Sequence, residues 1–334
     1  MNATDSIPDL PLHFVIRPEY TQCLKALLAD GVDAHSECFV YGPEAWGLQT
    51  FVHAKRAGWN VTVGTTCRRE AINLGHVSIL SAFQAGPRDL VVGIRADYRP
   101  SILADCHVVQ NQLQADSSSF WIPHWPQPGI IPRSPDRVGL QRAAYFGLEY
   151  YLDGGAAKWK ARLSEIGVEF DCPRQNRWHD YSEVDLVVAV RTFDGYPYPR
   201  KPPSKLFNAW IAGVPALVGP ESAYQQVGQP GRDFIVVQTM EEAIEWIARL
   251  KQSSETYSQL IQAGRERAEQ FTREKILASW AQMLETQIRP RWEQARSSGP
   301  IRLATWFFRQ GLGQIRATAV EWGRRVFGKR KLSR

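Results

Sequence analysis

The sequence predicts an α/β protein with two doubly wound domains, each built on a parallel sheet. Short apolar runs bounded by glycine or proline alternate with amphipathic helical patterns, which is typical of parallel β–α units. Residues 120–136 contain five prolines and interrupt this alternation, as an extended link between domains would. The chain has 334 residues, 44% of them hydrophobic, which is enough for roughly two domains.

The first half of the chain contains the signals of one such domain. The expected strands are residues 12–16, 37–43, 60–66, 89–96 and 106–111. The expected helices are residues 20–31, 46–58 and 69–85. The strands are short apolar runs, and the first helix ends at Gly31, a residue that commonly stops helices.

The second half repeats this organisation. The expected strands are residues 142–147, 168–172, 185–191, 214–219 and 233–237. The expected helices are residues 156–167, a short helix between Ser204 and Gly213, and residues 239–251, 254–271 and 272–288. Thr239 and Glu242 have the spacing of a capping box at the start of one helix. We expect Rossmann-like domains at residues 1–132 and 133–290, facing each other across a cleft.

Residues 291–334 form a tail whose charge differs from that of the body. Residues 296–334 contain ten Lys and Arg against one acid, Glu321, so this segment carries +9 and residues 1–295 carry −3 of the formal +6. A mildly acidic body argues against nucleic-acid binding, which needs cations on the folded surface.

The tail also contains an apolar stripe at helical spacing. The stripe consists of Phe308, Leu312, Ile315, Ala319, Trp322 and Val326, flanked by Arg302, Arg309 and Arg316. We expect a basic amphipathic helix that lies on an anionic membrane surface, because aromatic residues beside many cations suit that interface. The alternative is that the stripe packs on the protein itself.

Cysteine usage and the N-terminus bear on the compartment. The five cysteines are scattered without a C-x-x-C pair, which indicates neither a disulfide framework nor a thiolate metal site. No leader pattern and no uninterrupted run of about 18 apolar residues is present. We therefore expect a cytoplasmic protein, with peripheral contact at the inner face of the membrane.

Cations concentrate at the start of the short helix in the second half. Lys201 and Lys205 flank this start, and Ser204 is a favourable N-cap residue. The preceding strand ends at Arg191, and ligands of open parallel sheets bind where loops leave such strand ends. A helix N-terminus offers free N–H groups and a partial positive charge to an anion. The pattern predicts a phosphate site.

Polar residues around this helix suit the rest of a phosphorylated ligand. Asn208 lies three residues after Lys205 and shares its face of the helix. Glu221, Ser222 and Tyr224 follow the next expected strand, in a position suited to sugar hydroxyls or a ribose.

The run KLFNAWIAGVPALVGPESAY, residues 205–224, resembles the donor-binding half of GT-B glycosyltransferases. It is similar to the L-x-E-A-x-A-x-G-x-P-V helix of retaining enzymes and to the fucosyltransferase pattern E-K-x-x-N-A-x-x-A-G-x-V-P-V-x-x-G. The residues that match the second pattern are Lys205, Asn208, Ala209, Ala212, Gly213, Val214, Pro215 and Gly219. Ser204 replaces the glutamate of that pattern, and the two glutamates of the first fall on Arg200 and Asn208. Donor identity and stereochemistry therefore do not carry over.

The resemblance implies a hexosyl- or deoxyhexosyltransferase with an N-terminal acceptor domain and a C-terminal donor domain, as used in polysaccharide biosynthesis. The implied nucleotide-sugar-binding residues are Arg191, Lys201, Ser204, Lys205, Asn208, Glu221, Ser222 and Tyr224. Lys205 would also stabilise the diphosphate leaving group. No D-x-D pair is present, so we expect neither a metal nor another cofactor.

The acceptor side is less defined. We expect a saccharide or a lipid-linked glycan as acceptor. The candidates for the base that takes its hydroxyl proton are Asp97 and Glu44, each just after an expected strand of the first half, and His124. Two other functions stay open. The missing glutamates permit a noncatalytic nucleotide-sugar-binding scaffold, and a nucleotide-sugar-modifying oxidoreductase would need a bound nicotinamide.

Overall fold

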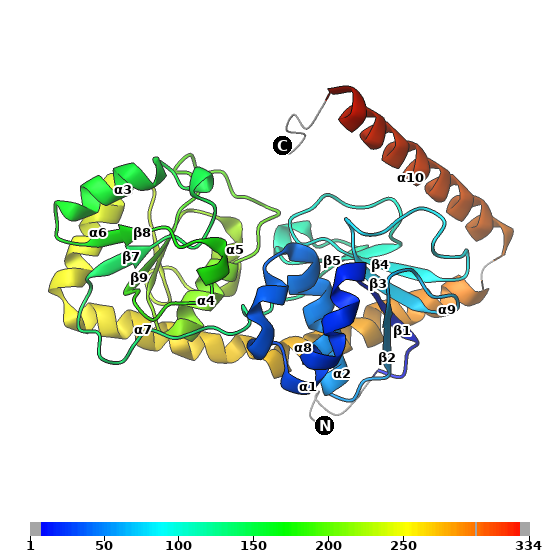
Figure 1. Ribbon diagram of the computed structural model, residues 1–334, viewed down its shortest axis with the longest axis horizontal. Coiled ribbons are helices and arrows are strands. Elements are labelled where there is room, and N and C mark those ends of the chain that lie inside the picture. Colours follow the sequence, from blue (N-terminus) through cyan, green and yellow to red (C-terminus); the bar gives the residue numbers. More distant parts are fainter. Residues whose placement is uncertain (1–7, 298, 328–334) are drawn as a thin grey trace.

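The computed structural model describes residues 8–297 and 299–327. These residues form two α/β lobes side by side, with one long helix, α10 (Pro300–Phe327), at the C-terminal end (Figure 1). Each lobe is built on one sheet, and neighbouring strands in both sheets are parallel. The predicted α/β fold with two parallel sheets is confirmed.

The first lobe contains a six-stranded sheet in the order β2-β1-β3-β4-β5-β6. Its strands are β1 (Leu12–Val15), β2 (Val61–Gly64), β3 (Ile72–His76), β4 (Leu90–Ile94), β5 (Cys106–Val109) and β6 (Ser119–Trp121). The helical segments are η1 (Pro18–Cys23), α1 (Leu24–Asp30), η2 (Asp33–Phe39), η3 (Glu44–Leu48), α2 (Gln49–Arg56) and η4 (Gln112–Gln114). Every residue of β1, β3, β4 and β5 is buried, as expected for strands covered on both faces.

The second lobe contains a five-stranded sheet in the order β11-β10-β9-β7-β8. Its strands are β7 (Arg142–Ala144), β8 (Glu169–Asp171), β9 (Leu186–Ala189), β10 (Ala216–Val218) and β11 (Ile235–Val236). The helical segments are η5 (Glu149–Tyr151), α3 (Gly155–Ser164), η6 (Gln175–Arg177), α4 (Ser204–Ala212), α5 (Ser222–Val227), α6 (Met240–Gln252), α7 (Ser254–Ala268) and η7 (Glu269–Phe271). Thr239 caps α6 as predicted, because its hydroxyl accepts from the Glu242 N–H at 3.1 Å.

Helices that follow the second lobe in sequence return to the first. They are α8 (Arg273–Met283), η8 (Leu284–Ile288) and α9 (Arg289–Ser297), and they run along the first lobe in Figure 1. Trp280 and Trp292 are buried in the same core as Phe14 of β1. The C-terminal helices therefore join the lobes, and the predicted domain boundaries stay a prediction.

Two predicted elements of the first lobe are wrong. Residues 37–43 are not a strand but the end of a 3-10 segment, which buries Phe39 before a helix that begins after Pro43. Residues 69–85 are not a helix, because β3 lies there between β1 and β4. A Cβ at Gly75 would lie 3.2 Å from the Val15 Cβ, so glycine permits the close approach of these strands.

The tail helix α10 docks on the first lobe through a face other than the predicted stripe. Arg309 donates to the Ile102 carbonyl at 2.9 Å and to Asp105 Oδ1 at 2.6 Å. On the stripe, Phe308 is 67% and Ile315 65% exposed. These two side chains of the stripe therefore do not pack on the protein, contrary to the alternative stated above. Within residues 8–297 and 299–327, none of the helices has the length and hydrophobicity of a membrane crossing.

Candidate functional site

The carboxyl ends of strands from both sheets meet where the two lobes touch. Asp97 follows β4 and Asn111 follows β5, whereas Lys201 lies in the loop after β9 and Ser222 begins α5. The Lys201 ammonium forms an ion pair with the Asp97 carboxylate, and Asn111 Nδ2 donates to Ser222 Oγ at 2.9 Å. Because open parallel sheets bind ligands at this end of their strands, the junction is the place to expect a site.

A buried cationic cluster lies on the second-lobe side of this junction. Arg191, two residues after β9, forms an ion pair with Glu221, and their side chains are only 9% and 2% exposed. Lys205 is in the first turn of α4, with its Nζ 5.2 Å from the centroid of the Tyr145 ring. No residue in the described part of the chain accepts a hydrogen bond from this ammonium. Two cations against one carboxylate give the cluster a net positive charge.

The charge state of Lys205 reflects this crowding. Burial lowers the pKa of Lys205 to about 7, and the nearby Arg191 charge acts in the same direction. The Glu221 carboxylate opposes this shift but is already paired with Arg191, so a bound anion would favour the charged form of Lys205. The cluster is therefore suited to an anionic ligand.

The start of α4 adds backbone donors to these charges. Ser204 is the first helical residue and not the predicted N-cap; Pro203 occupies that position, because its ring cannot continue the helix backwards. No side chain caps the helix, and the Leu206 N–H donates to the Pro203 carbonyl at 3.0 Å, so the N–H groups of Ser204 and Lys205 are the ones available to a ligand.

Three further predicted residues have different surroundings. Asn208 Oδ1 accepts from the Gln127 N–H at 3.2 Å, so this carboxamide holds the segment between the lobes. Ser222 Oγ donates to the Pro197 carbonyl at 2.8 Å and takes part in the contact between the lobes. Tyr224 is buried, and its hydroxyl has no partner within the described residues. Binding roles for all three stay predictions.

The two carboxylates among the predicted base candidates lie on the first-lobe side. Glu44 begins η3 with its side chain 2% exposed, and its Oε1 is 3.6 Å from Arg17 Nε. Burial raises the pKa of Glu44, and the nearby Arg17 charge opposes this shift. Asp97 is more open, and its carboxylate is engaged by Lys201 from the other lobe.

Two buried polar residues at this junction, His76 and Gln110, were not predicted from the sequence. His76 ends β3; its Nδ1 accepts from the Ser78 N–H at 3.2 Å, and its Nε2 has no partner in the described chain. Burial lowers the pKa of His76 to about 4, so the ring is neutral. Gln110 follows β5, is 1% exposed, and has no partner there for either carboxamide atom. The run INLGH, in which Ile72 and Leu74 alternate with Asn73 and Gly75 as in a strand, is the signal that could have placed His76 at a strand end.

Unpartnered polar atoms therefore collect around the junction. They are Glu44 Oε2, His76 Nε2, Gln110 Oε1 and Nε2, Glu221 Oε1 and the Tyr224 hydroxyl. Each buried polar atom without a partner costs roughly 1–3 kcal/mol. Within the described residues, no three His, Cys, Asp or Glu side chains are grouped so as to hold a metal ion.

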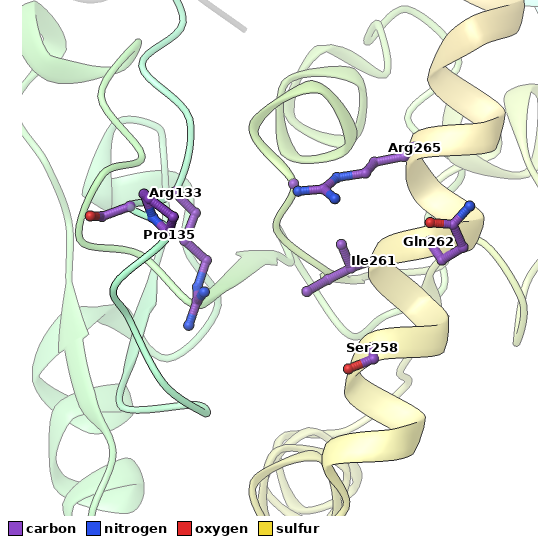
Figure 2. Close-up of a pocket in the computed structure, with 8 residues that line it drawn as sticks. Arg133, Pro135, Ser258, Ile261, Gln262 and Arg265 are labelled. Atoms are coloured by element: carbon purple, nitrogen blue, oxygen red, sulfur yellow. The ribbon is translucent and has the colours of Figure 1, made fainter.

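A separate groove of about 500 Å³ lies at the other end of α4, where Gly213 ends that helix. Figure 2 shows Arg265 reaching from α7 toward the loop that carries Arg133. None of the predicted site residues lines this groove.

Comparison with known proteins identifies the second lobe. Residues 146–282 match the family model described as glycosyl transferase-like. This part of the chain is similar to glycosyl transferase-like domains. It spans β9, the cationic cluster, α4 and α5, so the cluster lies within the part of the chain that the family model describes.

Solved structures are similar in fold to most of the chain. The glycosyltransferase AviGT4 matches with a TM-score of 0.51 at 12% identity, over 78% of this chain and 91% of its own. HepE of Anabaena in complex with UDP matches with a TM-score of 0.46 at 11% identity, over 82% of this chain and 99% of its own. TarM matches with a TM-score of 0.43 at 11% identity over 65% of this chain. This chain spans about half (54%) of the TarM chain. No curated protein matches by sequence. The glycosyl transferase-like domain is thus one half of a GT-B fold.

Proposed function

We propose that the protein transfers a hexosyl or deoxyhexosyl group from a nucleotide-sugar donor to a saccharide or lipid-linked glycan. The observation that carries this proposal is the buried cluster of Arg191 and Lys205 beside the uncapped start of α4, at the junction of two lobes. The glycosyl transferase-like domain around the cluster and the fold shared with AviGT4, a glycosyltransferase, support it.

In this proposal the cluster stabilises the nucleoside diphosphate that leaves during transfer. Lys205 and Arg191 supply fixed positive charge where negative charge develops, and the first N–H groups of α4 add oriented dipoles. Lys201 joins them when the diphosphate competes with Asp97 for its ammonium. Four groups of the chain thus provide the stabilisation, and we propose that the reaction needs neither a metal nor another cofactor.

The acceptor enters from the first lobe. Asp97 lies at the junction and becomes free when Lys201 turns to the diphosphate, so it is placed to take the proton of an acceptor hydroxyl. Glu44 is the second candidate, and its raised pKa makes its carboxylate a stronger base for that hydroxyl proton. Either role requires that the acceptor hydroxyl reach the end of β4 or the start of η3.

A nucleotide panel tests the donor site. UDP, GDP, ADP, TDP and CMP are added to the purified chain in a thermal-shift experiment, and at least one nucleoside diphosphate should raise the melting temperature by mass action. The matching nucleotide sugars are then assayed for release of free sugar, which a noncatalytic binding scaffold would not produce. Flat thermal responses to every nucleotide would contradict the proposal.

We further propose that α10 holds the protein on an anionic membrane surface at the cytoplasmic face. Phe308, Ile315 and Trp322 are 67%, 65% and 62% exposed, and they recur every seven residues along one face of the helix. From residue 314 to the end, the sequence contains seven Lys and Arg against one acid. Apolar side chains beside many cations complement anionic headgroups above an acyl layer.

Replacing Phe308 and Ile315 together by serine should release the protein from vesicles. The expected result in a flotation assay is that the wild-type chain floats with vesicles containing phosphatidylserine and the double variant stays at the bottom, because both apolar anchors are lost. Vesicles of neutral phosphatidylcholine are the control for charge. Equal flotation of wild type and variant would contradict this role, and a concentration-dependent dimer that the variant abolishes would assign the stripe to a second copy.

A further inference from the structure

An arginine on the first-lobe side of the junction is buried without a counterion. Arg95 follows β4 and is only 6% exposed. Its side chain makes one hydrogen bond, from Nε to the Tyr98 carbonyl at 3.3 Å, and no carboxylate of the described residues lies within ion-pair distance. A buried guanidinium carries five N–H donors, so most of the hydrogen-bonding capacity of Arg95 is unused.

A second arginine reaches the same place from the other lobe. Arg200 lies in the loop after β9, between two residues that are tied to the end of β5: Asn111 Nδ2 donates to the Tyr198 carbonyl at 3.4 Å and to the Lys201 carbonyl at 3.2 Å. Arg200 likewise has no ion-pair partner in the described chain. Because β4 and β5 are neighbours in the sheet, Arg200 is held beside the strand end that carries Arg95.

The electrostatics of the two arginines agree with this placement. Burial lowers the pKa of Arg95; the Asp116 carboxylate opposes this shift, and the Arg200 charge adds to it. Asp116 forms no ion pair with Arg95, and its Oδ1 accepts from the Ser118 N–H at 2.7 Å. Asp97, the other nearby acid, is paired with Lys201. Two like charges therefore face each other across the junction with no anion of the protein between them.

We infer that Arg95 and Arg200 bind an anionic group of the acceptor, a carboxylate or a phosphate, across the junction of the lobes. This inference rests on the proposed function and names the class of its acceptor, an acidic saccharide. The donor diphosphate has its own cations, Lys205 and Arg191, in the second lobe. Arg95 belongs to the first lobe, which is the acceptor side, and planar guanidinium groups suit bidentate recognition of either anion.

Small acidic sugars serve as probes of this site. Glucuronic acid, glucose 6-phosphate and glucose are titrated by ligand-observed NMR against the wild-type chain, with and without a saturating nucleoside diphosphate that fills the donor site. We expect one acidic sugar to bind at least tenfold more tightly than glucose under both conditions. The two acidic sugars distinguish a carboxylate site from a phosphate site.

Three variants complete the experiment. Arg95→Met and Arg200→Met should each weaken binding of the acidic sugar about tenfold or more, as loss of a charge-assisted pair does. Arg99→Met is the control and should have no effect, because Arg99 is an exposed arginine of the loop that carries Arg95. Arg200 is half-buried, so Arg200→Met remains informative if Arg95→Met folds poorly.

The outcomes separate this inference from the proposed function. Equal binding of glucose and the acidic sugars, or unchanged binding by Arg200→Met, would overturn the inference. Loss of nucleoside diphosphate binding by Arg95→Met would overturn it as well, since the arginine would then belong to the donor site. Failure of every nucleotide to bind the wild type would instead remove the donor site, while the titration without nucleotide still decides whether the anion site exists.

Discussion

Lys205→Met abolishes binding of the nucleoside diphosphate while the protein keeps or slightly raises its stability. The substitution removes a half-buried cation whose pKa is lowered by desolvation and by Arg191, so it relieves repulsion with Arg191 in the free protein. In the complex it removes a charge that would contact the diphosphate. Loss of one preorganised group at a developing charge typically lowers the rate about 10²- to 10³-fold, and we expect a loss of that size in sugar transfer.

The measurements for this variant are calorimetric titration, the melting temperature and the rate of donor turnover. Lys160→Met, which changes an exposed lysine on α3, is the matched control and should behave as wild type. Because the pKa of Lys205 is lowered to about 7, diphosphate affinity in wild type should fall as the pH rises through that value, and the variant should lose this dependence. A variant that binds and reacts like wild type would exclude Lys205 from the donor site.

Glu221→Gln destabilises the fold strongly. The Glu221 carboxylate is the ion-pair partner of Arg191, and both side chains are buried. Removing one partner of a buried pair typically costs about 3–5 kcal/mol because the other charge remains in a nonpolar environment. Urea unfolding should therefore show a loss of about 3 kcal/mol or more in the free energy of unfolding.

Two controls assign this loss to the buried charge. Glu241→Gln changes an exposed glutamate of α6, which is 65% exposed and 3.8 Å from Arg162, and it should cost less than about 1 kcal/mol. Combining Glu221→Gln with Arg191→Met should restore part of the stability, because no unpaired charge then remains. An equally small loss for Glu221→Gln and Glu241→Gln would show that the Arg191–Glu221 pair does not support the fold.

The sequence supports the second lobe better than the first for a physical reason. In the second lobe, each strand is followed by glycine, proline or a cap signal, so the alternation of strand and helix is legible. In the first lobe, β3 has only five residues, and the alternation of Ile72 and Leu74 with Asn73 and Gly75 is too brief to exclude a helix over residues 69–85. That error concealed His76.

The part of the site that consists of clustered cations could be predicted from the sequence. The part that consists of buried polar residues without partners could not. Lys201, Lys205 and Arg191 stand out in sequence because cations cluster at the start of a helix. Gln110 and Arg95 are single polar residues at strand ends, and only the structure shows that they lack partners. Contacts between the lobes, such as Lys201 with Asp97, join residues about a hundred positions apart and leave no local pattern.

A crystal structure of the chain with the nucleoside diphosphate that gives the largest thermal shift tests the central claim most directly. The account predicts that the diphosphate lies at the start of α4, within hydrogen-bond distance of Lys205 and close to Arg191, at the junction of the lobes. A diphosphate bound in the groove beside Arg265, or anywhere away from the carboxyl ends of β9 and β10, would contradict it.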